Sequence, residues 1–267
     1  MSELDLHSPD LFSGRPFTVE EARRLETLAA YAWPAGKTEA LDGWVLRFNH
    51  GVTRRANSVL PLRNHSTDPL EQQIETAEQF YRDHSLPPRF QITKAVQPDD
   101  LDAILERRGY VIEAPVNIQV APIKDFHPGR AAADGEVSLL DRPNDKWAEI
   151  YTTGFGRKVL PPIPAKQHGQ AIYPVFQNDA GETLGIGMGF LSGGWIGIFG
   201  MQTLHEHRGL GIGSALLMVF AAWGEQQGAH GLYLQLEHDN PGAERLYQRA
   251  GFKTVYGYHY RSLMENT

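Results

Sequence analysis

Apolar and polar positions along the first half of the chain recur in periods that predict alternating helices and strands. Apolar residues spaced three or four apart predict helices over about 18–33, 70–84 and 98–109. Short apolar runs bounded by turn residues predict strands over 44–48, 56–62, 90–92 and 111–120. Thr18 and Glu21 form a capping-box pattern, which marks the start of the first helix.

The second half repeats the order of the first. The same periods predict helices over 147–155, 211–227 and 241–250, and strands over 172–176, 184–191, 195–204, 232–236 and 252–261. Gly109-Tyr110 falls on Gly251-Phe252, and Ile74 falls on Leu216, when 142 is added to each number. Four elements share this spacing, which indicates an internal repeat.

Residues 126–135 are small, polar and rich in Gly and Pro, as in a linker. We therefore expect a flexible leader over 1–16, one domain over 17–125, the linker over 126–135 and a second domain over 136–267. Strands that precede and follow helices within each half predict an α/β (α+β) fold. Each domain is expected to hold a mixed, largely antiparallel sheet flanked by helices.

Composition narrows the class of protein. The chain contains 41% hydrophobic and 21% charged residues and no cysteine, which excludes disulfides and thiolate catalysis. A net charge of -7 argues against a nucleic-acid partner. No apolar run approaches the ~18 residues needed to span a bilayer, and residues 1–16 lack a secretory pattern. We expect a cytoplasmic protein with no membrane partner.

The segment His207–Ser214 reads HRGLGIGS and lies between a predicted strand and a helix. Glycines allow positive φ, so consecutive N–H groups can converge on an anion such as a pyrophosphate. Arg208 adds a permanent cation. A dinucleotide-binding turn is an alternative, but it needs a third glycine where Ser214 stands. A glycine-rich turn without a ligand is another. His205 and His207 have no third ligand at metal-site spacing, so no metal is expected.

The segment Asn240–Phe252 reads NPGAERLYQRAGF. Asn240 is a good N-cap, and proline suits the first helical position. Ala243, Leu246 and Tyr247 share one face of the predicted helix, which should pack on the sheet. A tyrosine on that face is either a core residue or a phenol directed into a cleft.

Residues 195–261 together resemble the GNAT acetyltransferases, through the Arg-x-x-Gly-x-Gly loop and the Asn-x-x-Ala-x-x-x-Tyr-x-x-x-Gly-Phe helix. The resemblance implies acetyl-CoA as co-substrate and Tyr247 as general acid near the coenzyme sulfur. The residues that it assigns to coenzyme binding are Met201, Gln202, Thr203, Arg208, Gly209, Leu210, Gly211, Ile212, Gly213, Ser214, Asn240 and Tyr247.

The base that accepts the amine proton is less clearly marked. Relatives place a glutamate where this chain has Gln235, which cannot accept a proton. Glu237 lies two residues on and faces the same side of the strand, so either it or a water relay is the expected base. The acceptor is expected to be a primary amine of a small molecule or peptide, and an oligomer is compatible with the sequence. The alternative function is a non-catalytic acyl-CoA sensor, which needs neither Tyr247 nor a base.

The first half lacks the corresponding chemistry. Ser66, Pro69 and Glu71 stand where the second half has Arg208, Gly211 and Gly213, so the cation and the glycines are missing. The whole chain resembles tandem-GNAT bacterial proteins with a degenerate N-terminal half. That half either walls the acceptor pocket through residues 42–44 and 54–57, or these polar-aromatic clusters only cap strands.

Overall fold

The computed structural model describes residues 15–124, 126–131, 134–160 and 162–264. The α-helices are α1 (Val19–Ala32), α2 (Leu70–Asp83), α3 (Leu101–Arg107), α4 (Asp145–Gly154), α5 (Ile212–Gln226) and α6 (Pro241–Arg249). The strands are β1 (Lys37–Leu41), β2 (Trp44–Phe48), β3 (Val59–Leu60), β4 (Arg89–Ile92), β5 (Val111–Pro122), β6 (Glu136–Leu140), β7 (Gln170–Gln177), β8 (Thr183–Ser192), β9 (Trp195–Thr203), β10 (Gly231–Glu237) and β11 (Lys253–Ser262). Two short 3-10 helices are η2 (Lys166–His168) and η3 (His205–His207).

The predicted helices are confirmed, with small changes at their ends. At the start of α1, Thr18 N–H donates to Glu21 Oε2 at 2.7 Å, and Glu21 N–H donates to Thr18 Oγ1 at 3.2 Å. This is the predicted capping box, which satisfies two donors that a helix end otherwise leaves free.

Three strand predictions need correction. β1 and β6 were missed because they are the two edges of the sheet, where polar residues break the apolar pattern. The strand predicted over 56–62 shrinks to β3. The Asn57 side chain instead accepts hydrogen bonds from Asn49 N–H at 2.7 Å and Gly51 N–H at 3.0 Å. These bonds hold residues 49–57 in a compact loop.

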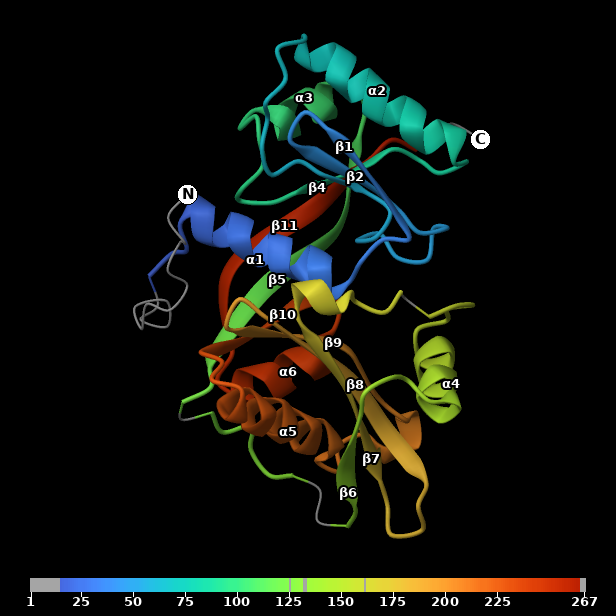
Figure 1. Cartoon of the computed structure of the whole chain (residues 1–267), viewed down its shortest axis with the longest axis vertical. Coiled ribbons are helices and arrows are strands. Elements are labelled where there is room, and N and C mark those ends of the chain that lie inside the picture. Colours follow the sequence, from blue (N-terminus) through green and yellow to red (C-terminus); the bar gives the residue numbers. More distant parts are fainter. Residues whose placement is uncertain (1–14, 125, 132–133, 161, 265–267) are drawn as a thin grey trace.

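All eleven strands belong to one sheet, in the order β1-β2-β3-β4-β11-β5-β10-β9-β8-β7-β6 (Figure 1). β11, from the end of the chain, lies between β4 and β5. β5, from the first half, lies between β11 and β10 and is antiparallel to both. The two halves have therefore exchanged their last strands. One continuous sheet contains the strands of both halves.

The internal repeat is visible in the order of elements. Adding 142 to the residue numbers of α2, β4, α3 and β5 gives segments that overlap α5, β10, α6 and β11 in turn. Both halves thus contain the same helix–strand–helix–strand unit. The domain limits at 17, 125 and 136 stay predictions, and most of the predicted leader, residues 1–14, lies outside the described residues.

The C-terminal part of the sheet has two covered faces because its side chains alternate. α1 and α4 pack with Trp195, Phe199 and Tyr233 on one face, which we call the α1–α4 face. α5 and α6 pack with Ile196, Ile198 and other aliphatic residues on the opposite α5–α6 face. None of the described helices is long and apolar enough to cross a membrane.

Candidate active site

The centre of the site is a fork between β9 and β10, two parallel strands that pair only as far as Ile198 and Leu234. On the other edge of β9, Gly200 and Met201 together stand opposite Gly187 of β8, which makes a β-bulge, and Gly200 has φ +58°. A bulge bends its strand, so β9 leaves β10 at this point. The edge of β9 beyond Ile198 therefore faces the fork.

The glycine loop follows β9 and leads into α5. Gly209 and Gly211 have φ of +81° and +88°, and Gly211 caps the helix in the left-handed conformation. Within the described part of the chain, the N–H groups of residues 209–214 donate to no backbone acceptor. Arg208 is exposed, and its Nε lies 3.4 Å from the Thr203 carbonyl oxygen. Free N–H groups, a helix N-terminus and a cation together suit a phosphate group.

Two of the predicted loop residues also have packing roles. A Cβ at Gly213 would lie 2.8 Å from Leu246 Cδ2, so this glycine lets α5 approach α6 closely. The Ser214 hydroxyl donates to the Pro128 carbonyl at 2.9 Å and anchors the segment that follows β5. Neither role leaves a signal in the sequence, because the partners are distant along the chain.

The other predicted donor-site residues divide between the two faces. Met201 packs against the α5–α6 core, and Ile212 is buried in it. The Gln202 side chain lies against Gly154, at the end of α4. Leu210 is exposed at the tip of the loop.

Asn240 and Tyr247 define α6. The Asn240 side chain accepts a hydrogen bond from Ala243 N–H at 3.1 Å, which makes it the expected N-cap. Tyr247 is buried on the α5–α6 face, with its ring 5.6 Å from that of Phe252 in an edge-on arrangement. Burial raises the pKa of Tyr247 to about 12. The phenol therefore keeps its proton at neutral pH, as a proton donor must.

Glu237 and Gln235 lie on the β10 arm of the fork, on the α1–α4 face. Glu237 is half-exposed, and its Oε1 lies 3.7 Å from Nη1 of Arg54, which comes from the first half of the chain. The Gln235 side chain accepts a hydrogen bond from the Tyr258 hydroxyl at 3.3 Å. The structure thus places Glu237 and Tyr247 on opposite faces of the sheet.

Residues of the first half also reach the β9 arm. The Arg55 guanidinium lies over the rings of Trp33 and Phe199, at 5.7 and 5.3 Å from their centroids. The polar cluster at residues 54–57 was the sequence signal for this contact. No sequence signal indicated that Trp33 would take part in it. The other predicted cluster, residues 42–44, does not take part, because Trp44 is buried in the core of the first half.

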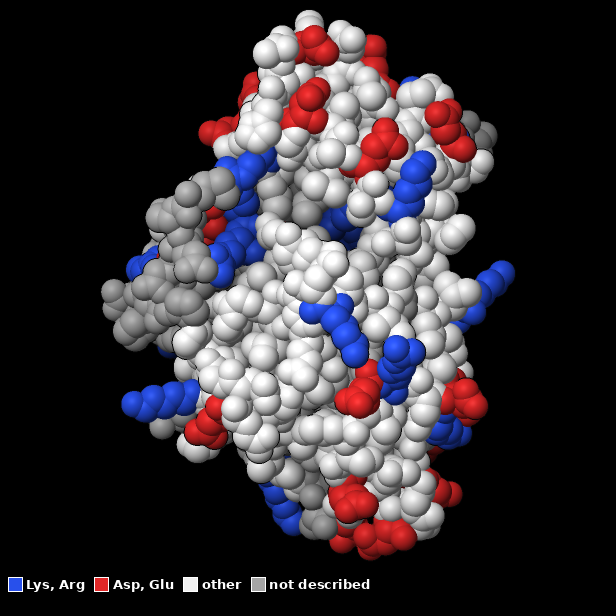
Figure 2. Space-filling view, viewed as in Figure 1, with Lys and Arg blue, Asp and Glu red and all other residues white. Residues whose placement is uncertain are grey.

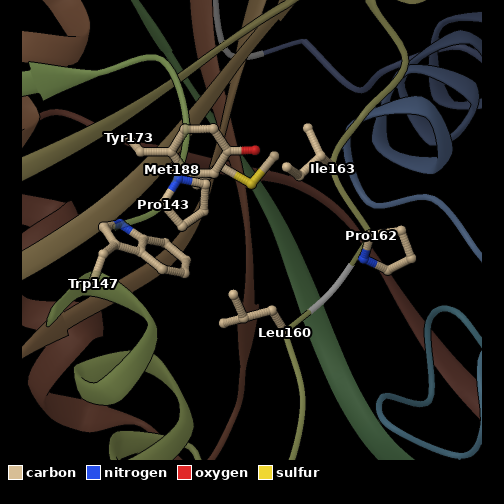
Figure 3. Close-up of a pocket in the computed structure, with 7 residues that line it drawn as sticks. All are labelled: Pro143, Trp147, Leu160, Pro162, Ile163, Tyr173 and Met188. Carbon is tan, nitrogen blue, oxygen red and sulfur yellow. The ribbon is translucent and has the colours of Figure 1, made fainter. Parts of the chain in front are cut away.

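A cavity of about 100 Å³ opens beside α4 on the α1–α4 face (Figure 3). Trp147, Tyr173 and Met188 form its inner wall, and Leu160, Pro162 and Ile163 close it from the loop that follows α4. Trp147 is itself buried in the core of this face, as are Tyr151 and Trp195.

The segment of the first half that corresponds to the glycine loop, residues 66–71, makes different contacts. Pro69 caps α2 without a side-chain hydrogen bond, and Glu71 is ion-paired with Arg108. A proline without an N–H and a carboxylate do not suit a phosphate. The fork and the glycine loop therefore occur together once in the described chain.

A sheet forked beside a glycine loop, with the same unit built twice in one chain, defines a tandem protein of the GNAT N-acetyltransferase fold. More particularly, the chain belongs to the family described as "Probable histone acetyltransferase Rv0428c C-terminal", whose model matches residues 19–261.

Two curated proteins illustrate this relationship. The chain is 28% identical over 255 residues to the "Uncharacterized N-acetyltransferase YobR" of Bacillus subtilis, which covers 91% of this chain and 99% of that protein. It is 26% identical over 253 residues to the "Probable histone acetyltransferase Rv0428c" of Mycobacterium tuberculosis, covering 94% and 77%. Membership implies the use of an acyl-CoA.

Solved structures support the fold over nearly the whole chain. A GCN5-related N-acetyltransferase from Kribbella flavida matches with a TM-score of 0.69 at 16% identity, covering 92% of this chain and 96% of that one. A tandem GNAT protein from the clavulanic acid biosynthesis pathway matches with a TM-score of 0.64 at 12% identity, covering 96% and 92%.

Proposed function

We propose that the protein transfers an acetyl group from acetyl-CoA to a primary amine of a small-molecule or peptide acceptor, at one site in its second half. One observation carries the proposal. The N–H groups of residues 209–214, which donate to no backbone acceptor in the described chain, follow β9 after η3, and β9 has left β10 beyond Ile198. A phosphate held by the loop would place the rest of a coenzyme along the unpaired edge of β9.

The residues then take distinct parts in the reaction. Arg208 and the loop N–H groups bind the pyrophosphate, and backbone groups of Met201 and Thr203 pair with the pantetheine amides. The amine nitrogen bonds to the thioester carbonyl carbon, and the carbon–sulfur bond breaks. Tyr247 gives its proton to the departing sulfur, and the amine proton passes to Glu237 or to water. The phenol of Tyr247 is protonated at neutral pH, and its place on α6 is the one that the family resemblance assigns to the proton donor.

Donor binding is tested by calorimetry with acetyl-CoA. The intact chain should bind one equivalent. Gly211→Glu should abolish binding, because it adds a carboxylate and a Cβ where φ is +88° and an anion is expected. Gly228→Glu is the matched control at the other end of α5, where φ is also positive and nothing lies within 4 Å of a Cβ. Two equivalents, or equal binding by both variants, would contradict the proposal.

Transfer is tested separately by release of free thiol with a panel of primary amines. Release that depends on the amine, with formation of the acetylated amine by mass spectrometry, is the expected result. Binding of acetyl-CoA without transfer to any amine would favour the acyl-CoA sensor instead.

A further inference from the structure

We propose that Arg55 recognises an anionic group of the acceptor, so that the amine substrate carries a carboxylate or a phosphate. This inference rests on the proposed acetyl transfer and names the substrate class for it. Arg55 belongs to the first half of the chain, yet it stands on the α1–α4 face of the fork in the second half.

The position of Arg55 is fixed by aromatic rings. Its guanidinium lies over Phe199, the first residue of β9 beyond the last pair with β10, and over Trp33 at the end of α1. The two rings are 5.7 Å apart. Tyr258 of β11 interacts with the same guanidinium and donates to Gln235 on the β10 arm. Arg55 is thus held across the opening of the fork.

The charge of Arg55 is not compensated by direct pairing. Within the described chain it forms no ion pair with a carboxylate, and its Nε is buried without a hydrogen-bond partner. The residue as a whole is half-buried, and its guanidinium also interacts with the Tyr258 hydroxyl. Glu26 is the carboxylate whose charge acts on it, and that group already accepts hydrogen bonds from Tyr256 and Gln91.

A neighbouring arginine shows what a structural role looks like in this fold. Arg47 is also buried, and it donates to the Ser58 carbonyl at 3.1 Å, the Ser58 hydroxyl at 2.8 Å and Gln91 Oε1 at 2.7 Å. Buried polar groups are normally satisfied in this way. Arg55 instead lies beside two aromatic rings, and its buried Nε has no hydrogen-bond partner within the described chain, which suits a binding group.

The chemistry of guanidinium then selects the ligand. Its planar donors match the two oxygens of a carboxylate or phosphate. Figure 2 shows basic side chains over much of the middle of the face in view, together with a few acidic ones, and acidic side chains at its upper and lower ends.

The test is direct binding of amine-free probes to the full-length protein, with and without saturating coenzyme A. Titration calorimetry compares 3-phenylpropanoate with 3-phenylpropanamide, and phenyl phosphate replaces the carboxylate in a third titration. The variants are Arg55→Met, Arg55→Lys and the matched control Arg107→Met, which removes one exposed arginine from α3. Coenzyme A affinity is measured in each variant.

We expect the wild-type protein and Arg107→Met to bind an anionic probe roughly 10- to 100-fold more tightly than the amide, as for other charge-assisted hydrogen bonds. Which anion binds better identifies carboxylate or phosphate as the group. Arg55→Met should lose the preference with unchanged coenzyme A affinity, and Arg55→Lys should keep part of it. No anion preference in the wild type, or a preference that survives Arg55→Met, overturns the inference.

Chemical modification provides a second test. If Arg55→Met does not fold, phenylglyoxal modification of the wild type replaces it, and 3-phenylpropanoate should protect Arg55 but not Arg107. Absence of that protection overturns the inference. The probes need no acetyl donor, so failure of acetyl-CoA binding counts against the proposed function alone.

Discussion

Glu26 offers a quantitative test of the buried interface between α1 and the sheet. Its side chain comes from α1, and the residue is only 2% exposed. The Tyr256 hydroxyl donates to Oε1 at 3.1 Å, and the Gln91 amide donates to Oε2 at 2.8 Å. Burial outweighs these bonds and the charges of Arg47 and Arg55, so that the pKa of Glu26 rises from 4.5 to about 7.

The sign and size of the effect follow from proton linkage. Below pH 4.5 the carboxyl is protonated in both the folded and unfolded states. Between pH 4.5 and 7 the unfolded chain releases this proton and the folded protein keeps it, so the free energy of unfolding falls as pH rises. At about 1.4 kcal/mol for each pH unit between the two pKa values, Glu26 should cost about 2–3 kcal/mol between pH 5 and pH 8.

Glu26→Gln removes this cost because an amide resembles the protonated acid. Its oxygen can accept from Gln91, and its N–H can donate to the Tyr256 oxygen, while the Tyr256 hydroxyl turns to the Ala22 carbonyl at 3.5 Å. The assay is urea unfolding followed by tryptophan fluorescence at pH 5, 6, 7 and 8. Relative to wild type, the variant should gain about 2–3 kcal/mol of stability between pH 5 and pH 8.

Glu21→Gln is the matched control on the same helix. A hydrogen bond from the Arg15 side chain is the largest cause that lowers the pKa of Glu21. Its stabilisation is present above the unfolded pKa and is lost only as pH falls through the lower folded pKa. The difference between this variant and wild type should stay constant from pH 6 to pH 8. If the Glu26→Gln difference were also constant, or if that variant lost stability at high pH, Glu26 would be an ionised partner of Arg47 or Arg55.

Two more predictions concern the reaction and the exchanged strands. Tyr247→Phe should lower turnover by ~10²–10⁴-fold with little change in acetyl-CoA affinity, because the proton donor acts in the chemical step. Stopped assays measure turnover, and calorimetry measures the affinity. An unchanged rate would make Tyr247 a packing residue. A fragment of residues 131–267 should be unfolded when measured by circular dichroism, because β10 and β11 lose the strand between them. A fragment of residues 111–267, which contains β5, should regain structure. If the shorter fragment folded and bound coenzyme, this prediction would be wrong.

Local periodicity was enough to predict the helices, the glycine loop and the repeat. α5 could be located because apolar residues recur at helical spacing after Gly211, and α6 because Asn240 and proline mark its start. These signals act within a few residues. For the same reason the sequence predicted where the loop lies but not which of its side chains are used elsewhere, as Ser214 is by Pro128.

Contacts between distant segments were not predictable. Antiparallel pairing of β5 with both β10 and β11 joins residues more than a hundred positions apart, and no local pattern encodes the exchange. The place of Arg55 over Phe199 has the same origin. Arg54-Arg55 appeared as a polar cluster at a strand end, but only the tertiary fold brings it to the fork.

The exchanged strands give the first half a structural role, although it has no glycine loop. β5 pairs with β10 from Gly231 to Glu237, the full length of the strand that carries one arm of the fork. Without β5, β10 would have an open edge beside the fork and nothing to hold it apart from β9. Ser66–Glu71 lies outside β5, so the absence of a glycine loop there leaves intact the strand that the first half lends to its neighbour.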